Sequence, residues 1–123
     1  MVQARGVHEV AIRVRDLARS EAFYRSLLGA AAAGRDEDHH RVFLGVAGRR
    51  AMIVLQEDKG DWPAQRHKFA VDERDIDRAA ALLRAQGIEA RGPVIDEGSA
   101  RKSLHVNDPD GNSLDFYAPL NGH

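Results

Sequence analysis

Hydrophobic and polar residues follow two different periods near the start of the chain. In residues 9–15 apolar side chains alternate with charged or small ones, which is the period of a strand with one buried face. In residues 17–28 the apolar side chains recur at spacings of three, four and seven, as on one face of a helix. Asp16 is placed to cap this helix and Gly29 to end it. This region therefore predicts a strand followed by a helix.

Residues 67–87 repeat the same order. Phe69 and Val71 are predicted as buried strand positions, Asp75 as the cap of a second helix and Gly87 as its end. The apolar stripe of this helix consists of Ile76, Ala79, Ala80 and Leu83. The chain therefore contains two copies of one strand–helix unit.

Further strands are predicted after the first helix. Residues 30–40 hold alanines and then charged residues, which predicts a weak edge strand or a loop. Residues 41–47 and 51–57 read as a hairpin around Gly48-Arg49-Arg50. The polar segment 57–66 marks a loop that crosses to the second copy.

Three more strands are predicted after the second helix. Residues 88–95 contain a proline and favour an edge strand, whereas residues 102–108 alternate cleanly. Asp-Pro-Asp-Gly-Asn at 108–112 is a strong turn signal before a final strand at 113–119. Each half of the chain is therefore predicted to be βαβββ.

Length and composition narrow the class of protein. The 123 residues suit one domain over 1–123, with module one at about 6–57 and module two at about 66–119. Eighteen basic and nineteen acidic residues are scattered along the chain, which argues against a nucleic-acid or membrane-surface partner. The chain has no cysteine, which excludes disulfides, thiolate metal sites and Cys nucleophiles. With no predicted leader or membrane-spanning run, we expect a cytoplasmic protein whose partners are a small molecule or another copy.

The motifs that carry a family resemblance lie at the two ends of the chain. HEVAIRVRDLARSEAFYRSLLG at 8–29, followed by the second unit and by DPDGNSLDFY at 108–117, resembles the vicinal oxygen chelate superfamily. This superfamily includes glyoxalase I, extradiol dioxygenases, fosfomycin-resistance thiol transferases, methylmalonyl-CoA epimerase and bleomycin-binding proteins. The resemblance implies an α+β fold in which paired βαβββ modules form a half-open barrel with a cleft. It also implies completion by dimerisation and a metal held by His or Glu side chains.

The family's first two metal-ligand positions do not fall on histidines in this chain. The first position, seven residues before the Asp that starts the first helix, is Glu9, and His8 is one residue away. The second, five residues before the last buried residue of its strand, is Arg66, and His67 is again one residue away. Arginine cannot ligate a metal, because its guanidinium stays protonated.

The remaining positions of the family pattern are also altered. The final ligand position falls on Asp115, which keeps the charge of the usual Glu on a shorter side chain. The fourth position, used by the glyoxalase branch, falls near the apolar Val54. Two carboxylates of the usual set therefore remain, and a fixed cation replaces a histidine.

Strand parity gives a second test of the two histidines. His8 shares parity with Val10, and His67 with Phe69, so both are predicted on the helix-covered face. A histidine packed under a helix or reaching solvent is therefore favoured over a metal ligand at each position. A bulge at the start of either strand would turn its histidine inward instead. In that case a divalent metal would be held by His8, Glu9, His67 and Asp115.

The opposite parity defines the predicted cleft face. Its polar residues are Glu9, Arg13, Arg66, Lys68, Ser103, His105, Asp115 and Tyr117. We hypothesise a metal-free cleft in which Arg66 lies between Glu9 and Asp115. The alternative is that Arg66 belongs to the preceding loop and points to solvent. His105 and Tyr117 are placed to act as an acid–base group or a hydrogen-bond donor, or else to bond a local partner.

Two further features lie outside the predicted cleft face. Trp62, in the polar crossing loop, is predicted either to cover the cleft or to pack at a dimer contact. His39 and His40 adjoin an acidic stretch and face opposite ways on an extended chain, which predicts a solvated segment rather than a metal site.

Two functions follow from these patterns. The first is binding of a small molecule in the cleft, as in bleomycin-resistance proteins, without metal or chemistry. The second is a metal-dependent lyase, dioxygenase or thiol transferase that acts on a chelating, oxygen-bearing substrate. Arg66 favours the first, and the two histidines near the strand starts keep the second open. A homodimer is expected for either, because open sheet edges leave surface for a second copy to cover.

Overall fold

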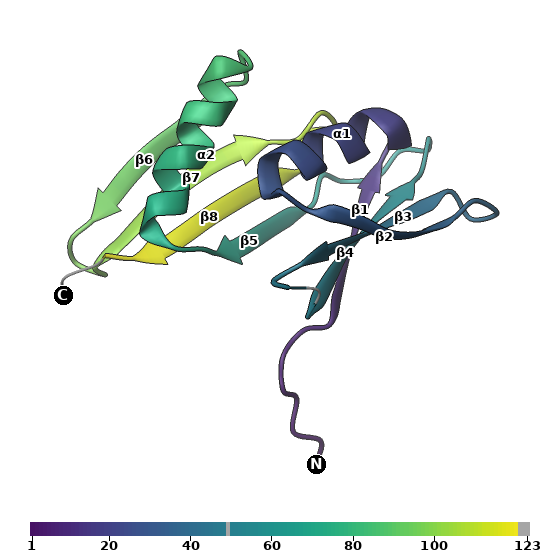
Figure 1. Ribbon diagram of the computed structural model, residues 1–123, viewed down its shortest axis with the longest axis horizontal. Coiled ribbons are helices and arrows are strands. Elements are labelled where there is room, and N and C mark those ends of the chain that lie inside the picture. The colour runs from purple at the N-terminus through teal and green to yellow at the C-terminus, as the bar shows by residue number, and fades with distance from the viewer. Residues whose placement is uncertain (49, 121–123) are drawn as a thin grey trace. The chain divides into compact units, whose positions relative to one another are not determined.

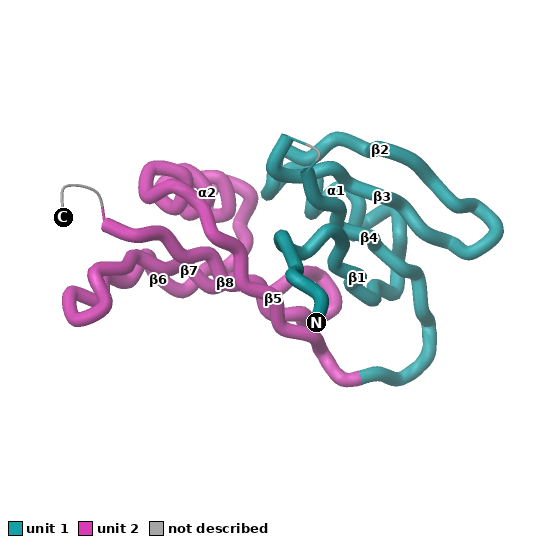
Figure 2. Tube along the Cα trace, turned by 90° about the horizontal axis from the view of Figure 1, so that it is seen from below, with its two compact units in different colours: residues 1–62 teal, residues 63–123 magenta. Residues whose placement is uncertain are grey.

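The computed structural model describes residues 1–48 and 50–120. The chain forms two compact units, residues 1–62 and 63–123, which Figure 2 shows in separate colours. Each unit is described by itself. Arg49, in the predicted hairpin turn, lies outside the described residues.

The first unit is a four-stranded sheet with one helix. Strand β1 is parallel to β4, the other neighbours are antiparallel, and the strand order is β1-β4-β3-β2. The helix contacts the two strands β3 and β4 (Figure 1). The elements are β1 (Glu9–Val14), α1 (Leu17–Leu28), β2 (Ala31–Asp36), β3 (Arg41–Val46) and β4 (Ala51–Glu57).

The second unit repeats this topology strand for strand. Its order is β5-β8-β7-β6, again with one parallel pair, β5 and β8, and its helix contacts β6, β7 and β8. The elements are β5 (Arg66–Ala70), α2 (Glu73–Ala85), β6 (Ala90–Asp96), β7 (Arg101–Asn107) and β8 (Ser113–Pro119). The predicted pair of βαβββ modules in an α+β fold is confirmed.

Several predicted boundaries need correction. The cap of α2 is Asp72 rather than Asp75, because the Asp75 amide already donates to the Asp72 carbonyl at 3.0 Å within the first turn. Val71 follows β5 instead of ending it, and it is half-buried. Arg66 is the first residue of β5 and not part of the crossing loop. The uncertain segment after α1 is an edge strand, β2, with an irregular register between residues 32 and 34.

Alternation places one face of each sheet under its helix. In the first unit this buried face includes Ile12, Val42, Leu44 and Leu55, and Tyr24 of α1 is fully buried beside it. In the second unit the buried residues are Leu104, Val106, Leu114 and Phe116 from the sheet and Ile76, Ala80 and Leu83 from α2. The other face of each sheet is its open face.

One buried charge lies between helix and sheet in the first unit. Glu21 of α1 accepts two hydrogen bonds from Arg35 of β2, at 2.7 and 2.6 Å, and a longer one from Arg25. These hydrogen bonds, led by the one from Arg35, lower the pKa of Glu21 although burial acts against them. The bidentate pair ties α1 to the weak edge strand.

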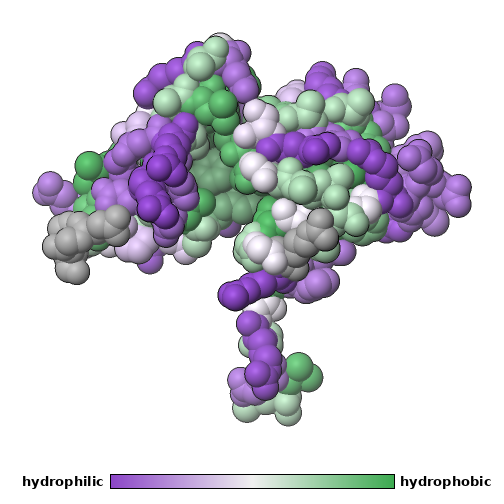
Figure 3. All heavy atoms as spheres, in the orientation of Figure 1, coloured by the Kyte–Doolittle hydropathy of each residue, from purple (hydrophilic) through white to green (hydrophobic). Residues whose placement is uncertain are grey.

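Residues 1–8 precede the first strand and are exposed. Figure 3 shows hydrophobic colour at the N-terminal end of the chain, where Met1 and Val2 are exposed. Within the described part of the chain, no helix is long and apolar enough to cross a membrane.

Candidate functional site

The open face of the second sheet carries a row of three charged or titratable side chains. Lys68 of β5 is in register with Asp115 of β8, which is in register with His105 of β7. Register partners point to the same face of a sheet, so the three lie side by side. We refer to Lys68, Asp115 and His105 as the charged row.

Asp115 is the buried member of this row. Its side chain is only 7% exposed, and its Oδ1 lies 2.5 Å from His105 Nδ1. Its Oδ2 lies 3.5 Å from Arg66 Nη2, a longer contact from an arginine that is 80% exposed. Burial raises the pKa of Asp115, but the hydrogen bonds and charges of His105 and then Arg66 outweigh it, so that the pKa is lowered. The carboxylate is therefore ionised and already has two partners.

The turn at 108–112 holds the start of β5 beside the start of β8, the two strands that carry Arg66 and Asp115. Asp108 is buried and accepts hydrogen bonds from the amides of Asp110 and Asn112, both at 2.9 Å. Asn112 Oδ1 in turn accepts from the Gln65 amide at 2.9 Å, and the Ser113 amide donates to the Gln65 carbonyl at 2.8 Å. This network holds the residue before Arg66 against the start of β8. The turn motif thereby places Arg66 within reach of Asp115.

A hollow of about 340 Å³ lies over the charged row, and we call it the open-face hollow. Two cations meet at the ring of Tyr117 in this hollow: Lys68 Nζ lies 5.4 Å and Arg101 Cζ 5.1 Å from the ring centroid. The residues that line it are Lys68, Asp96, Ser99, Arg101, Ser103, His105, Asp115, Phe116 and Tyr117. Five of the eight predicted cleft residues therefore line one cavity.

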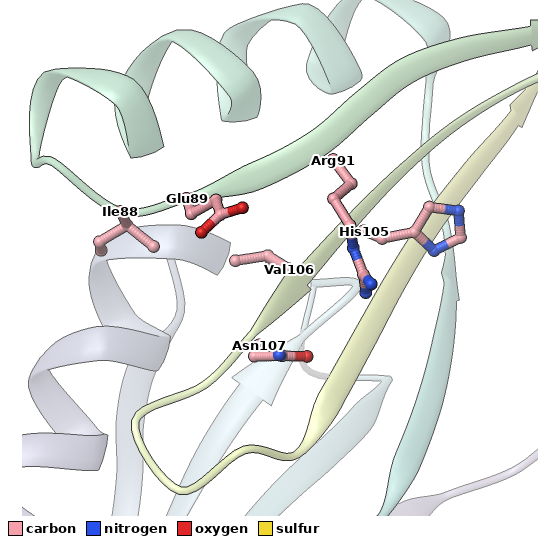
Figure 4. Close-up of a pocket in the computed structure, with 6 residues that line it drawn as sticks. All are labelled: Ile88, Glu89, Arg91, His105, Val106 and Asn107. Carbon is pink, nitrogen blue, oxygen red and sulfur yellow. The ribbon is translucent and has the colours of Figure 1, made fainter.

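A second hollow, of about 320 Å³, lies near the start of β6. Figure 4 shows the side chains of Arg91 and His105, which are in register on β6 and β7. Its other lining residues are Ile88, Glu89, Val106 and Asn107. His105 lines both hollows, but the charged row and Tyr117 belong to the open-face hollow, which is the better candidate for a ligand site.

The first unit has apolar residues at the positions that correspond to the charged row. Ala11 of β1 is in register with Val54 of β4, which is in register with Phe43 of β3. The parallel pair and the antiparallel pair match those of the second unit strand for strand. The pseudo-equivalent of Asp115 is therefore Val54, which is buried and cannot bind a metal.

The two histidines near the strand starts differ in their surroundings. His67 is in register with Leu114 on the helix-covered face, as parity predicted, and its Nε2 is buried without a hydrogen-bond partner among residues 1–48 and 50–120. His8 precedes β1 and is exposed, which is the second of the two predicted alternatives, a histidine that reaches solvent. The strand begins one residue later, and only the backbone carbonyl of His8 joins the sheet, accepting from the Met52 amide at 2.8 Å.

The remaining predicted cleft residues belong to the first unit. Glu9 is the first residue of β1, and the inclusion of Glu9 in an ion-pair cluster stays a prediction. Arg13 lies on the open face of its sheet, with its Nε 3.8 Å from Asp58. The Arg15 guanidinium lies over the Trp62 ring, with Cζ 4.6 Å from the ring centroid. The indole Nε1 of Trp62 donates a hydrogen bond to the Asp58 carbonyl at 3.1 Å. Trp62 is thus held by its own unit.

Arg101, Asp96 and Ser99 line the hollow but were absent from the sequence prediction. The predicted strand began at Lys102, one residue after the observed start of β7. Arg101 has the parity of Ser103 and His105, so a strand extended by one residue would have included it. Asp96 and Ser99 belong to the end of β6 and the turn after it, where alternation gives no guidance.

The residues of the second unit fit a metal ion poorly. His105 and Asp115 are two possible metal ligands that lie close together, but each is already in contact with the other. Arg66, at the family's second ligand position, brings a positive charge to the same carboxylate. Over residues 1–48 and 50–120, no group of three His, Cys, Asp or Glu side chains is arranged to hold a metal.

Several known proteins are similar to this chain in sequence or in fold. The family model described as Glyoxalase/Bleomycin resistance protein/Dioxygenase superfamily matches residues 6–116. The uncharacterized protein YaeR of Escherichia coli K12 is 27% identical in an alignment of 129 positions that covers 95% of this chain and 98% of YaeR.

Two solved structures are similar over nearly the whole chain. An integron cassette protein from the mobile metagenome of the Halifax Harbour sewage outfall is 37% identical, with a TM-score of 0.85 over 94% of this chain and 99% of that one. Lactoylglutathione lyase from Agrobacterium tumefaciens is 21% identical, with a TM-score of 0.80 over 94% of each chain. The second likeness concerns the fold alone.

Proposed function

Because the chain belongs to the glyoxalase/bleomycin resistance protein/dioxygenase superfamily, we propose that it binds a small organic molecule in the open-face hollow without a divalent metal. The proposal concerns the second unit, whose sheet carries the charged row and the cavity above it. The superfamily contains both binding proteins and metal-dependent enzymes, so the choice between these two functions rests on the residues of this site.

The observation that carries the proposal is the state of Asp115. This carboxylate occupies the family's final metal-ligand position, but its two oxygens already face His105 at 2.5 Å and Arg66 at 3.5 Å. A divalent ion would have to displace the histidine and approach a fixed cation. Arg66 thus supplies a positive charge, and His105 a close polar contact, at the carboxylate that a metal would otherwise bind.

The first test is calorimetric titration of nickel, zinc, manganese and iron(II) into chelator-treated protein. We expect no stoichiometric binding by the natural chain. The variant Arg66→His removes the cation and adds an imidazole, the ligand that suits nickel and zinc, beside two existing donors. Its affinity for nickel or zinc should rise by about tenfold or more, equivalent to ~1.4 kcal/mol.

The matched control is Arg74→His on the exposed surface of α2. This variant makes the same change of side chain outside the charged row, where Arg74 forms a long ion pair with Asp72 at 3.8 Å. It should bind metal no better than the natural chain. Tight binding by the natural chain that disappears in Asp115→Asn would overturn the proposal and favour the metal-dependent enzyme instead.

We also propose that the protein is a homodimer. The support is the outer strand of the second sheet, β6, which has one neighbour and exposes two apolar side chains, Val94 at 52% and Ile95 at 55%. An exposed edge strand with apolar residues is a surface that another chain can cover.

A further inference from the structure

We propose that the ligand of the open-face hollow carries an anionic group, a carboxylate, phosphonate or phosphate, bound jointly by Lys68 and Arg101 beside Tyr117. This inference rests on the proposed function and names the chemical class of its ligand. The sequence alone left this point unresolved, since its charges pointed both to an anion and to a cation.

The two cations of the hollow have no acidic partner among the residues that the structure describes. The side chains of Lys68 and Arg101 contact the Tyr117 ring, and within residues 1–48 and 50–120 neither donates a hydrogen bond or forms an ion pair. Other cations of the same unit are paired: Lys102 with Asp77 at 2.8 Å, and Arg78 with Asp75 at 3.6 Å. Among the residues that line the open-face hollow, Lys68 and Arg101 are thus cations without an ion pair in the described part of the chain.

Their arrangement is unfavourable without a ligand. Two like charges near one aromatic ring repel each other, and the ring offsets only part of this through its electron-rich face. A single anion between them would add two attractions that offset this repulsion. A lysine and an arginine together suit an oxyanion, because the first acts as a compact charge and the second as a planar pair of donors.

The two carboxylates of the hollow differ in how far their charge is already balanced. Asp115 is buried and engaged by His105 and Arg66, so its charge is already compensated. Asp96 Oδ1 accepts a hydrogen bond from the Ser99 amide at 3.3 Å, within the turn that follows β6. The Ser99 and Ser103 side chains add hydroxyl groups to the same lining. Asp96 keeps its negative charge and is in register with Arg101, but no ion pair joins the two among residues 1–48 and 50–120. The groups that can bind an anion are therefore Lys68, Arg101 and the two hydroxyls.

The test uses three probes of similar shape but different charge, together with inorganic phosphate. Benzoate, benzamide and benzamidine are an anion, a neutral amide and a cation, and inorganic phosphate is the second anion. Each is titrated to millimolar concentration into the full chain with chelator present, and the amide resonances of β7 and β8 are followed by NMR. We expect benzoate or phosphate to shift the resonances of Ser103 and Tyr117, and to bind more tightly than benzamide and benzamidine.

Charge-removing variants locate the effect. Lys68→Gln and Arg101→Gln should each weaken anion binding by about tenfold, as expected for the loss of a charge-assisted contact. Arg74→Gln on α2 removes the same charge outside the hollow and should leave the affinity unchanged. An unchanged amide spectrum outside the hollow shows that each variant is folded.

The outcomes separate this inference from the proposed function. Equal binding of benzoate and benzamide, or preference for benzamidine, would overturn the anion while leaving a metal-free small-molecule site intact. No response to either anion would also overturn it, as would equal loss of affinity in the Arg74→Gln control. Preference for phosphate over benzoate would assign the site to phosphate or phosphonate groups, and the reverse preference to carboxylates.

Discussion

His67 carries a ring nitrogen that is buried without a partner in the described part of the chain. Burial lowers the pKa of His67, and the nearby Asp108 charge offsets only part of this. Between the lowered value and the ordinary value of 6.5, the unfolded chain binds more protons than the folded one. His67 therefore makes the protein less stable as the pH falls below the ordinary value, and has no such effect above it.

The variant His67→Leu tests this at the scale of one side chain. It keeps the volume roughly constant on the helix-covered face and removes the unpaired nitrogen, so the free energy of unfolding should rise by about 1 kcal/mol at neutral pH. The gain should grow as the pH is lowered below about 6.5, because the titration of the imidazole is removed. Urea unfolding across this pH range measures both effects.

His8→Leu is the matched control, since His8 is exposed. Its stability should stay close to that of the natural chain at every pH. A loss of stability in His67→Leu of the size expected for a lost ligand or network would contradict the assignment of His67 as an isolated, buried histidine.

Single residues were predicted unevenly. Parity placed Lys68, Ser103, His105 and Tyr117 on one face with Asp115, because a strand has only two faces. Parity does not say which side chains bond one another. The His105–Asp115 contact therefore required the register of β7 on β8, which depends on the geometry of the turn at 108–112 and not on alternation alone.

At the scale of elements, the two helices begin differently. The Asp16 side chain accepts a hydrogen bond from the Arg19 amide at 3.0 Å, and Glu57 at the end of β4 accepts from the Leu17 amide at 3.0 Å. The first helix thus has two of its free amides satisfied by carboxylates. Asp72 stands at the same position before α2 but makes no such side-chain hydrogen bond.

Alanine substitutions compare the two caps. Asp16→Ala should lower the free energy of unfolding by about 1 kcal/mol, the usual cost of losing a capping hydrogen bond. Asp72→Ala should cost clearly less, because the contacts it loses are those of an exposed residue. Thermal unfolding of both variants beside the natural chain gives the comparison. A larger effect at Asp72 would contradict the difference between the caps.

Elements were predicted well where a period extended over many residues. Both helices and the alternating strands, such as β1 and β7, follow from the spacing of apolar residues. The glycines that follow the helices, Gly29 at φ 61° and Gly87 at φ 72°, mark where they end. The edge strand β2 was uncertain because its residues, AAAGRD, have low strand propensity. It is held instead by pairing with β3 and by the Glu21–Arg35 contact, neither of which follows from the propensities of the strand's own residues.

At the scale of the whole molecule, the homodimer proposal makes a direct prediction. Light scattering after gel filtration should give twice the mass of one chain. The double variant Val94→Lys and Ile95→Lys should shift this to the mass of one chain, because charges on an edge strand oppose pairing. The same change at Val2 is the control. A single-chain mass for the natural protein would contradict the dimer, and a dimer unaffected by the double variant would exclude the β6 edge as its surface.

The contrast between the charged row and its apolar counterparts, Ala11, Val54 and Phe43, has a consequence for how a duplicated chain diverges. Twin halves begin with the same chemistry, and a site built symmetrically would need both halves to keep it. Here the halves have specialised. Exchanges among apolar residues should be tolerated at the three positions of the first half, whereas each position of the charged row should tolerate only substitutions that preserve its electrostatic role. New ligand chemistry can therefore arise by altering one half while the other continues to serve as scaffold.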